Sequence, residues 1–413
     1  MMSTVARYVV ITLMLTMIPP VFAQERLTLE AAIQYAMANN PIRGVAQCQI
    51  TAATANLQGA HMLRNPEILI APTVIGTQGA ESVVAFAQPL ELNGARGART
   101  RIATGALRTA EAGAQITNRD LTLNVSIAYW DLAQAEAIAG VDAENVRYAE
   151  TLLAAARKQV ELGHVPESQA IKTEVELARA QQQLTRTKAS VAQAQITLNT
   201  VTGRDPNIAI TTADALTSTS TGFDLVAAQN QDGTLRPELA QAQAQMMAAA
   251  GEVEAARAAR RPDLLILAQT QNWNGPGGVA IGLSLPVFDW GSARAEIRRA
   301  GAALAAQEKN VDVVRQNVRR DVRTAAIAVS SAESQVRVLR ERVLGPAETL
   351  ANMANLGYQE GATNYLEVLE ARRTLRAAHA EYHSALGDYH RALAQLAWAS
   401  GSTSLLKSGE EKR

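Results

Sequence analysis

Two glutamates near the C-terminal end of the chain have a spacing that suits interaction with cations. Glu367 and Glu370 are three positions apart, so on a helix they share one face. Carboxylates gathered on one face favour cations. Two glutamates on an exposed helix face are also commonly no more than solvated charges, so the pair alone does not identify a site.

Three histidines follow on the same segment, namely His379, His383 and His390. His379 and His383 have the four-residue spacing of a helical metal-binding pair, but the glutamate-flanked zinc motif does not surround them. We therefore expect surface or inter-helix packing for these histidines and predict no metal site. The sequence has no glycine-rich phosphate loop, cysteine cluster or nucleophile elbow, so catalysis has no candidate residues and no cofactor is expected.

The N-terminus has the pattern of an exported protein. Arg7 precedes an apolar run over residues 8–18, and a small-residue site ends at Ala23. The run is too short to cross a bilayer as a helix, which takes about 20 residues. We therefore expect a signal peptide that is cleaved after Ala23.

The composition favours long packed helices over a compact globule. Aromatic residues make up only 4% of the chain, whereas a large compact core relies on them for buried area. Alanine, the best helix former, is abundant and suits helices packed side by side. The 39 basic and 39 acidic residues cancel and are interspersed, so nucleic-acid binding has no electrostatic support. The single cysteine, Cys48, excludes an internal disulfide.

The second half of the chain repeats the first at a spacing of about 200 residues. The tetrapeptide Ala-Glu-Thr-Leu occurs at 149–152 and again at 347–350. Gly163 and Gly203 recur as Gly361 and Gly401 with the same offset. The chain is therefore a tandem duplication, and each copy is expected to contain a helix, two strands, a very long helix, a turn and a second long helix.

Each copy contains one segment with the pattern of a β-hairpin, at residues 67–90 and 263–287, split by a glycine-containing turn. In the second segment Val279, Ile281 and Leu283 alternate with small residues. A strand with hydrocarbon on one side and an open lumen on the other needs this alternation. An edge hairpin of a soluble sheet is the alternative interpretation.

The segments 95–162 and 292–360 follow the two hairpins and are expected to be single helices. A helix of this length is on the order of 100 Å long, which is typical of coiled coils. Each meets a glycine-centred turn, at Gly163 or Gly361, and the chain then returns as an antiparallel partner helix. The duplication therefore predicts two long helical hairpins per chain.

In this order the motifs resemble the TolC family of outer-membrane efflux channels. They are Leu-Thr-Leu-Glu-Ala-Ala at 27–32, Gln-Pro-Leu-Glu-Leu-Asn-Gly at 88–94 and Tyr-Gln-Glu-Gly at 358–361. The resemblance implies a mainly α fold with a small membrane β part: each chain gives four strands to a twelve-stranded trimeric β-barrel, and the tandem helical hairpins form an α-barrel tunnel. Trimerisation would close strand edges that hydrocarbon does not tolerate.

The resemblance also implies roles for residues at the second turn. Glu367 and Glu370 match acidic residues that line the periplasmic constriction, and Tyr358 matches a tip tyrosine that would hydrogen-bond to the neighbouring hairpin. Gln169 and Thr363 depart from the pattern, because an acidic and a basic residue are common there. The usual ion pairs of the gate are therefore not expected in this chain.

Partners follow from the same resemblance. It implies a homotrimer in outer-membrane lipid that spans the periplasm and receives its cargo from an inner-membrane pump through a periplasmic adaptor protein, which would contact the hairpin tips at Gly163, Gly361 and Thr363. Residues 88–99 resemble the strand exit of cobalt, zinc and cadmium resistance channels, so heavy-metal export with a resistance-nodulation-division pump is the working hypothesis. Drug or solvent efflux and type I protein secretion are alternatives, and a periplasmic structural coiled coil is an alternative of another class.

The expected organisation of the chain combines these signals. It consists of a signal peptide (1–23), an N-terminal equatorial helical segment (24–65), a first barrel hairpin (66–91), a first helical hairpin (92–203), an equatorial linker (204–235), a helix of the second repeat (236–261), a second barrel hairpin (262–288), a second helical hairpin (289–401) and a polar tail (402–413).

Overall fold

The computed structural model describes residues 25–72, 82–218, 236–270, 277–285, 290–360 and 362–401. The expected signal peptide, the tail 402–413 and Gly361 lie outside these residues, as does much of the linker. The elements in chain order are β1 (Glu25–Leu27), α2 (Leu29–Asn39), α3 (Pro41–His61), β2 (Glu67–Pro72), β3 (Ser82–Pro89), α4 (Ala95–Glu161), α5 (Glu167–Thr202), β4 (Ile210–Thr212), α7 (Pro237–Ala258), β5 (Asp263–Thr270), β6 (Gly277–Ser284), α8 (Ser292–Val338), η1 (Leu339–Leu344), α9 (Gly345–Gln359) and α10 (Tyr365–Ser400).

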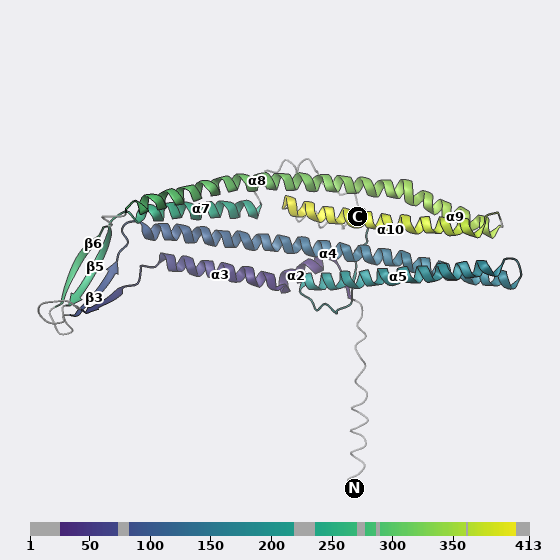
Figure 1. The fold of residues 1–413 in the computed structure, drawn as a ribbon, viewed down its shortest axis with the longest axis horizontal. Helices are drawn as coiled ribbons and strands as arrows, with labels where there is room; N and C mark the ends of the chain where they lie inside the picture. The colour runs from purple at the N-terminus through teal and green to yellow at the C-terminus, as the bar shows by residue number, and fades with distance from the viewer. Residues whose placement is uncertain are drawn as a thin grey trace, which may run out of the picture.

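The molecule is long and narrow, with the sheet at one end and the tips of two helical hairpins at the other (Figure 1). The first hairpin consists of α4 and α5, and the second of α8, η1, α9 and α10. The shorter helices α3 and α7 run beside the sheet-proximal halves of α4 and α8. The strand-rich segments therefore lie far from the tips that carry Glu367 and Glu370.

The four long strands form one antiparallel sheet in the order β2-β3-β5-β6. The two hairpins of the duplication join through β3 and β5, where Phe86 lies opposite Ala268. Within the described part of the chain, β2 and β6 each have only one neighbouring strand. One chain therefore leaves two sheet edges open, which is the arrangement that needs further strands.

One face of this sheet is aliphatic across all four strands. Directly opposed residues of an antiparallel pair point to the same face, and the register pairs Ile68 with Phe86 and Ile266 with Ile281. Val279 and Ile281 are 77% and 75% exposed. The apolar residues on this face are Ile68, Ile70, Val84, Phe86, Leu264, Ile266, Ala268, Val279, Ile281 and Leu283, and the register also places Gln88 and Thr270 on it. The strict alternation of β6 does not extend to β2 and β5, where Leu69, Leu265 and Leu267 are apolar on the opposite face.

The prediction of one unbroken helix over 292–360 is wrong, because the π-helix η1 interrupts it. Pro346 has no N–H to donate, and its ring clashes with the carbonyl of the residue four positions earlier. A π turn absorbs this defect, and the backbone N–H of Gly345 donates to the carbonyl of Arg340. The corresponding helix α4 has no proline and runs without interruption.

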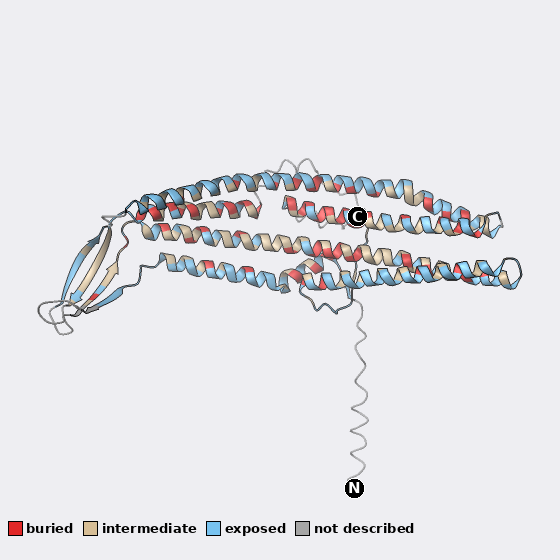
Figure 2. Ribbon diagram, viewed as in Figure 1, coloured by how far each residue is buried: buried red, intermediate tan, exposed pale blue. Residues whose placement is uncertain are grey.

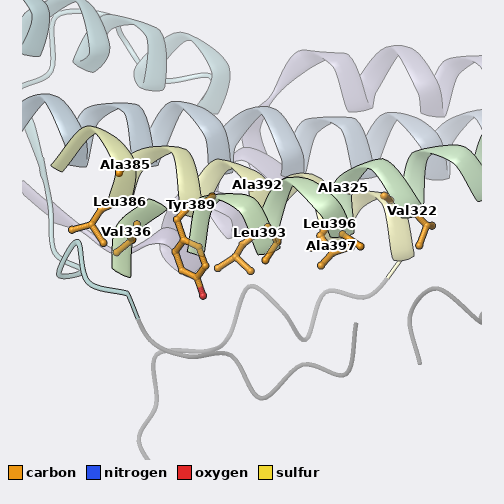
Figure 3. Close-up of a cluster of buried hydrophobic side chains, with 14 residues drawn as sticks. Val322, Ala325, Val336, Ala385, Leu386, Tyr389, Ala392, Leu393, Leu396 and Ala397 are labelled. Carbon is orange, nitrogen blue, oxygen red and sulfur yellow. The ribbon is translucent and has the colours of Figure 1, made fainter. Parts of the chain in front are cut away.

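The buried core is divided into clusters along the length of the molecule, densest near its middle (Figure 2). The largest cluster joins α8 to α10, where Leu386, Tyr389, Leu393 and Leu396 meet small residues of α8 (Figure 3). A second cluster joins α2, β1 and β4 to α4 around Tyr129. Alanine forms much of both clusters, which accounts for the low aromatic content.

Helices α4 and α7 approach each other closely at two glycines. A Cβ atom on Gly105 would lie 2.7 Å from the backbone nitrogen of Ala248, and one on Gly251 would lie 2.9 Å from the backbone nitrogen of Ile102. Neither backbone can move away without separating the helices. The two glycines therefore set the spacing of this helix pair.

We expect Gly105→Ala to lower the free energy of unfolding by about 1–3 kcal/mol, because a methyl group forced into a packed helix contact separates the backbones. Gly97→Ala is the matched control, since a Cβ on Gly97 of the same helix meets nothing within 4 Å. Thermal unfolding in detergent, followed by circular dichroism, measures both. Equal midpoints for the two variants would contradict the close-packing argument.

Candidate functional site

The two predicted gate carboxylates lie at the start of α10. Asn364 caps the helix, and its Oδ1 accepts a hydrogen bond from the backbone N–H of Glu367 at 3.0 Å. The Nδ2 of Asn364 lies 3.5 Å from Oε1 of Glu367. Both Glu367 and Glu370 are exposed. Glu370 accepts a hydrogen bond from Thr374 Oγ1 through its backbone carbonyl and not through its carboxylate. The structure therefore leaves both carboxylates available to a partner or an ion.

The other residues predicted for the tip have packing and capping positions. Tyr358 is half-buried against Ala351 and Val368, so its hydrogen bond to a neighbouring hairpin stays a prediction. The hydroxyl of Thr363 donates to the carbonyl of Ala354 at 3.1 Å and closes the end of α9. Gly163 has a φ of 71° in the turn between α4 and α5, a left-handed conformation that glycine adopts readily.

Two ion pairs that the sequence analysis missed connect the two hairpins above the tips. Arg376 Nη1 of α10 donates to Oδ1 of Asp142 in α4 at 2.7 Å, and Arg373 pairs with Glu176 of α5. The Asp142 side chain is only 2% exposed. α4 also contains Asp120 and Asp131, so nothing in the sequence singled out Asp142.

A cation–π contact strengthens the same junction. The Arg372 guanidinium lies 3.8 Å from the ring centroid of Tyr148 on α4. The Tyr148 hydroxyl donates to Oδ1 of Asn355 on α9 at 3.4 Å. The start of α10 is therefore held to the first hairpin by charge and aromatic contacts rather than by apolar packing alone.

His390 packs between helices, as predicted. Its ring stacks on Trp130 with centroids 3.7 Å apart, and Nε2 lies 3.0 Å from the carbonyl oxygen of Thr217. Burial lowers the pKa of His390 from 6.5 to about 4, because the charged imidazolium loses its hydration. The imidazole is therefore neutral in the folded protein at neutral pH.

This depressed pKa predicts acid sensitivity. Above pH 6.5 the imidazole is neutral in both folded and unfolded chains, and its stabilising contribution is complete; as pH falls from 6.5 toward 4, only the unfolded chain gains the proton. At pH 5 the loss is about 2 kcal/mol per chain. His390→Gln should flatten the fall in unfolding midpoint between pH 7.5 and pH 5, while the exposed-site control His61→Gln keeps it. An unchanged slope in His390→Gln would show that another group is responsible.

Comparison with known proteins supports an efflux channel fold and family. The sequence pattern of the outer membrane efflux protein family matches residues 32–204 and 234–402, one stretch in each half of the duplication. The cobalt-zinc-cadmium resistance protein CzcC of Cupriavidus metallidurans is 27% identical over 391 residues, which cover 91% of each chain. The nickel and cobalt resistance protein CnrC of the same organism is 27% identical over 296 residues, 68% of this chain and 69% of that protein.

Solved structures share the fold. CusC superposes with a TM-score of 0.75 at 19% identity, over 91% of this chain and 92% of that chain. The CmeC outer membrane channel of Campylobacter jejuni gives 0.77 at 16% identity, over 90% and 85%. Among the described residues, no helix is both long and apolar enough to cross a membrane. The family pattern covers most of both repeats, and the chain therefore belongs to the outer membrane efflux protein family.

Proposed function

We propose that this chain is the outer-membrane channel of a tripartite efflux system and exports heavy-metal cations. The observation that carries the proposal is the four-stranded sheet, which has an exposed aliphatic face and two open edges. An open edge is not tolerated in hydrocarbon. Three chains joined edge to edge would give a closed twelve-stranded barrel, with the helical hairpins extended into the periplasm.

The gate follows from the same arrangement. In a three-chain ring, Glu367 and Glu370 each give three carboxylates at the periplasmic end of the tube, and such rings attract cations. Arg373 and Arg376 would hold the second hairpin against the first while the tube is closed. A periplasmic adaptor protein would contact the tips at Gly163, Gly361 and Thr363 and pass on cargo from an inner-membrane pump.

The metal assignment rests on similarity along the whole chain to a cobalt-zinc-cadmium resistance protein. The strand exit that resembles metal-resistance channels adds less, because Arg99 Nη2 donates to the buried Glu91 at 2.9 Å. That arginine has a structural role at the junction of sheet and helix. Drug or solvent efflux therefore remains the second candidate.

Deletion of the gene tests the substrate. The deletion strain should lose tolerance to at least one of zinc, cobalt, nickel, cadmium, copper and silver, and a plasmid copy should restore it. A panel of drugs and solvents is run on the same strains. Unchanged metal tolerance with increased drug or solvent sensitivity would replace the metal assignment with the second candidate.

The assembly is tested on the purified protein. We expect extraction only with detergent and a trimer mass by light scattering. A mature chain that is monomeric and stays in solution without detergent would instead favour a periplasmic coiled coil.

A further inference from the structure

His379 and His383 form an open pair on α10. Their ring centroids are 6.3 Å apart and their planes differ by 18°. Both side chains are half-buried. Residues four apart on a helix are neighbours on its surface, so one ion can contact both imidazoles after small side-chain rotations.

A carboxylate from another helix faces His379 of this pair. Oε1 of Glu348, on α9, lies 3.9 Å from Nε2 of His379. Two ligand atoms bound to one tetrahedral ion at about 2.1 Å are about 3.4 Å apart. The observed distance is therefore close to that of two ligands that share an ion.

A buried polar atom in the pair also lacks a partner. Nδ1 of His383 is buried and has no hydrogen-bond partner within the described part of the chain. Such atoms are rare in folded proteins and call for an explanation, of which a bound ion or water is one. The histidine pair is thus only partly satisfied by the protein itself.

The ligand types define the class of ion. Imidazole nitrogen together with one carboxylate suits zinc, cobalt or nickel rather than magnesium or calcium, which prefer oxygen. As placed, the described residues contain no group of three His, Cys, Asp or Glu side chains ready to hold a metal ion. The ligands must close around the ion, so binding is weak, which suits an ion that has to leave again.

We infer that His379, His383 and Glu348 form a low-affinity site for a divalent transition-metal cation, which bridges α9 and α10. The inference goes beyond the expectation from the sequence, which assigned packing to these histidines. The site lies nine residues beyond Glu370, about 14 Å further along α10. That this ion is also the exported cargo rests on the proposed function. Binding of the ion to the site does not.

Titration of the purified full-length trimer with Co²⁺ tests the inference. The protein carries a purification tag without histidine, and binding is followed by calorimetry and by the visible absorption of Co²⁺. We expect one ion per chain, and at least a tenfold loss of affinity in His379→Gln, His383→Gln. The matched control is the double variant His61→Gln, His164→Gln, which removes two histidines outside α10. It should bind Co²⁺ with the affinity of the parent protein.

Glu348→Gln provides a second variant at a half-exposed position, where folding is expected to be unaffected. It should weaken Co²⁺ binding several-fold and leave the trimer mass and the helical circular dichroism unchanged. Absence of Co²⁺ binding, or binding that survives in the double histidine variant, overturns the inference. If metal tolerance depends on the gene but the site does not bind Co²⁺, the inference fails and the proposed function stands. If Co²⁺ binds at the site but metal tolerance is independent of the gene, the proposed function fails and the inference stands.

Discussion

Glu367→Ala, Glu370→Ala is expected to weaken the block of single channels by multivalent cations about tenfold and to raise their conductance. The variant removes all carboxylates of both proposed rings, so a multivalent cation loses its main attraction at the constriction. The shorter side chains also widen the passage. The measurement is single-channel current in planar bilayers, with hexamminecobalt(III) as the blocking ion.

Two further variants separate charge from size. Glu367→Gln, Glu370→Gln keeps the side-chain volume, so block should weaken while conductance rises less than in the alanine variant. Glu161→Gln, Glu167→Gln removes the same number of charges from exposed positions at the tip of the first hairpin. Currents of the alanine variant that match the parent channel would place the constriction elsewhere.

Arg376→Ala is expected to cost about 3–5 kcal/mol of stability, because it leaves the buried carboxylate of Asp142 without its partner. Loss of the pair also weakens the attachment of α10 to α4 near the tips, so channels should spend more time open. Unfolding in detergent gives the first quantity and bilayer currents give the second. Arg315→Ala is the control, since its exposed pair with Asp312 within one helix contributes about 0–1 kcal/mol.

A double variant shows whether the effect arises from the pair itself. Asp142→Asn, Arg376→Ala removes the buried charge together with its partner and should recover part of the lost stability. If the double variant is as unstable as the sum of both single variants, the two side chains act independently and the proposed connection between hairpins is absent.

The order of elements was predictable because it depends on local signals. Glycines and prolines mark the turns at Gly163 and Gly203, and alternation marks β6. These signals span a few residues each and need no knowledge of how distant segments align. The joining of β3 to β5 was not predicted, because the duplication supplies two hairpins without fixing which of their strands pair.

The contacts between hairpins were not predictable for the opposite reason. The Arg376–Asp142 pair connects residues more than 200 positions apart, and it forms only for one relative shift of two long helices. The close contact between Gly105 and Ala248 was unpredictable for the same reason, because the sequence alone shows only two small residues on different helices. Glu348 and His379 likewise meet across two helices whose relative shift no local pattern fixes.

The π segment has a consequence for the symmetry of a three-chain tube. Because each chain carries two copies of one plan, such a tube contains six hairpins that could be nearly equivalent. A residue inserted into a regular α-helix would rotate everything beyond it by about 100°, whereas a π turn holds the additional residue within one wider turn. The second copy has one residue more than the first between helix start and tip turn, since 292–361 corresponds to 95–163; η1 lies within that stretch, and α4 in the first copy has no such turn. The π turn therefore takes up the additional residue, and the two tips of each chain keep corresponding rotational positions, which favours a nearly sixfold arrangement of the tips.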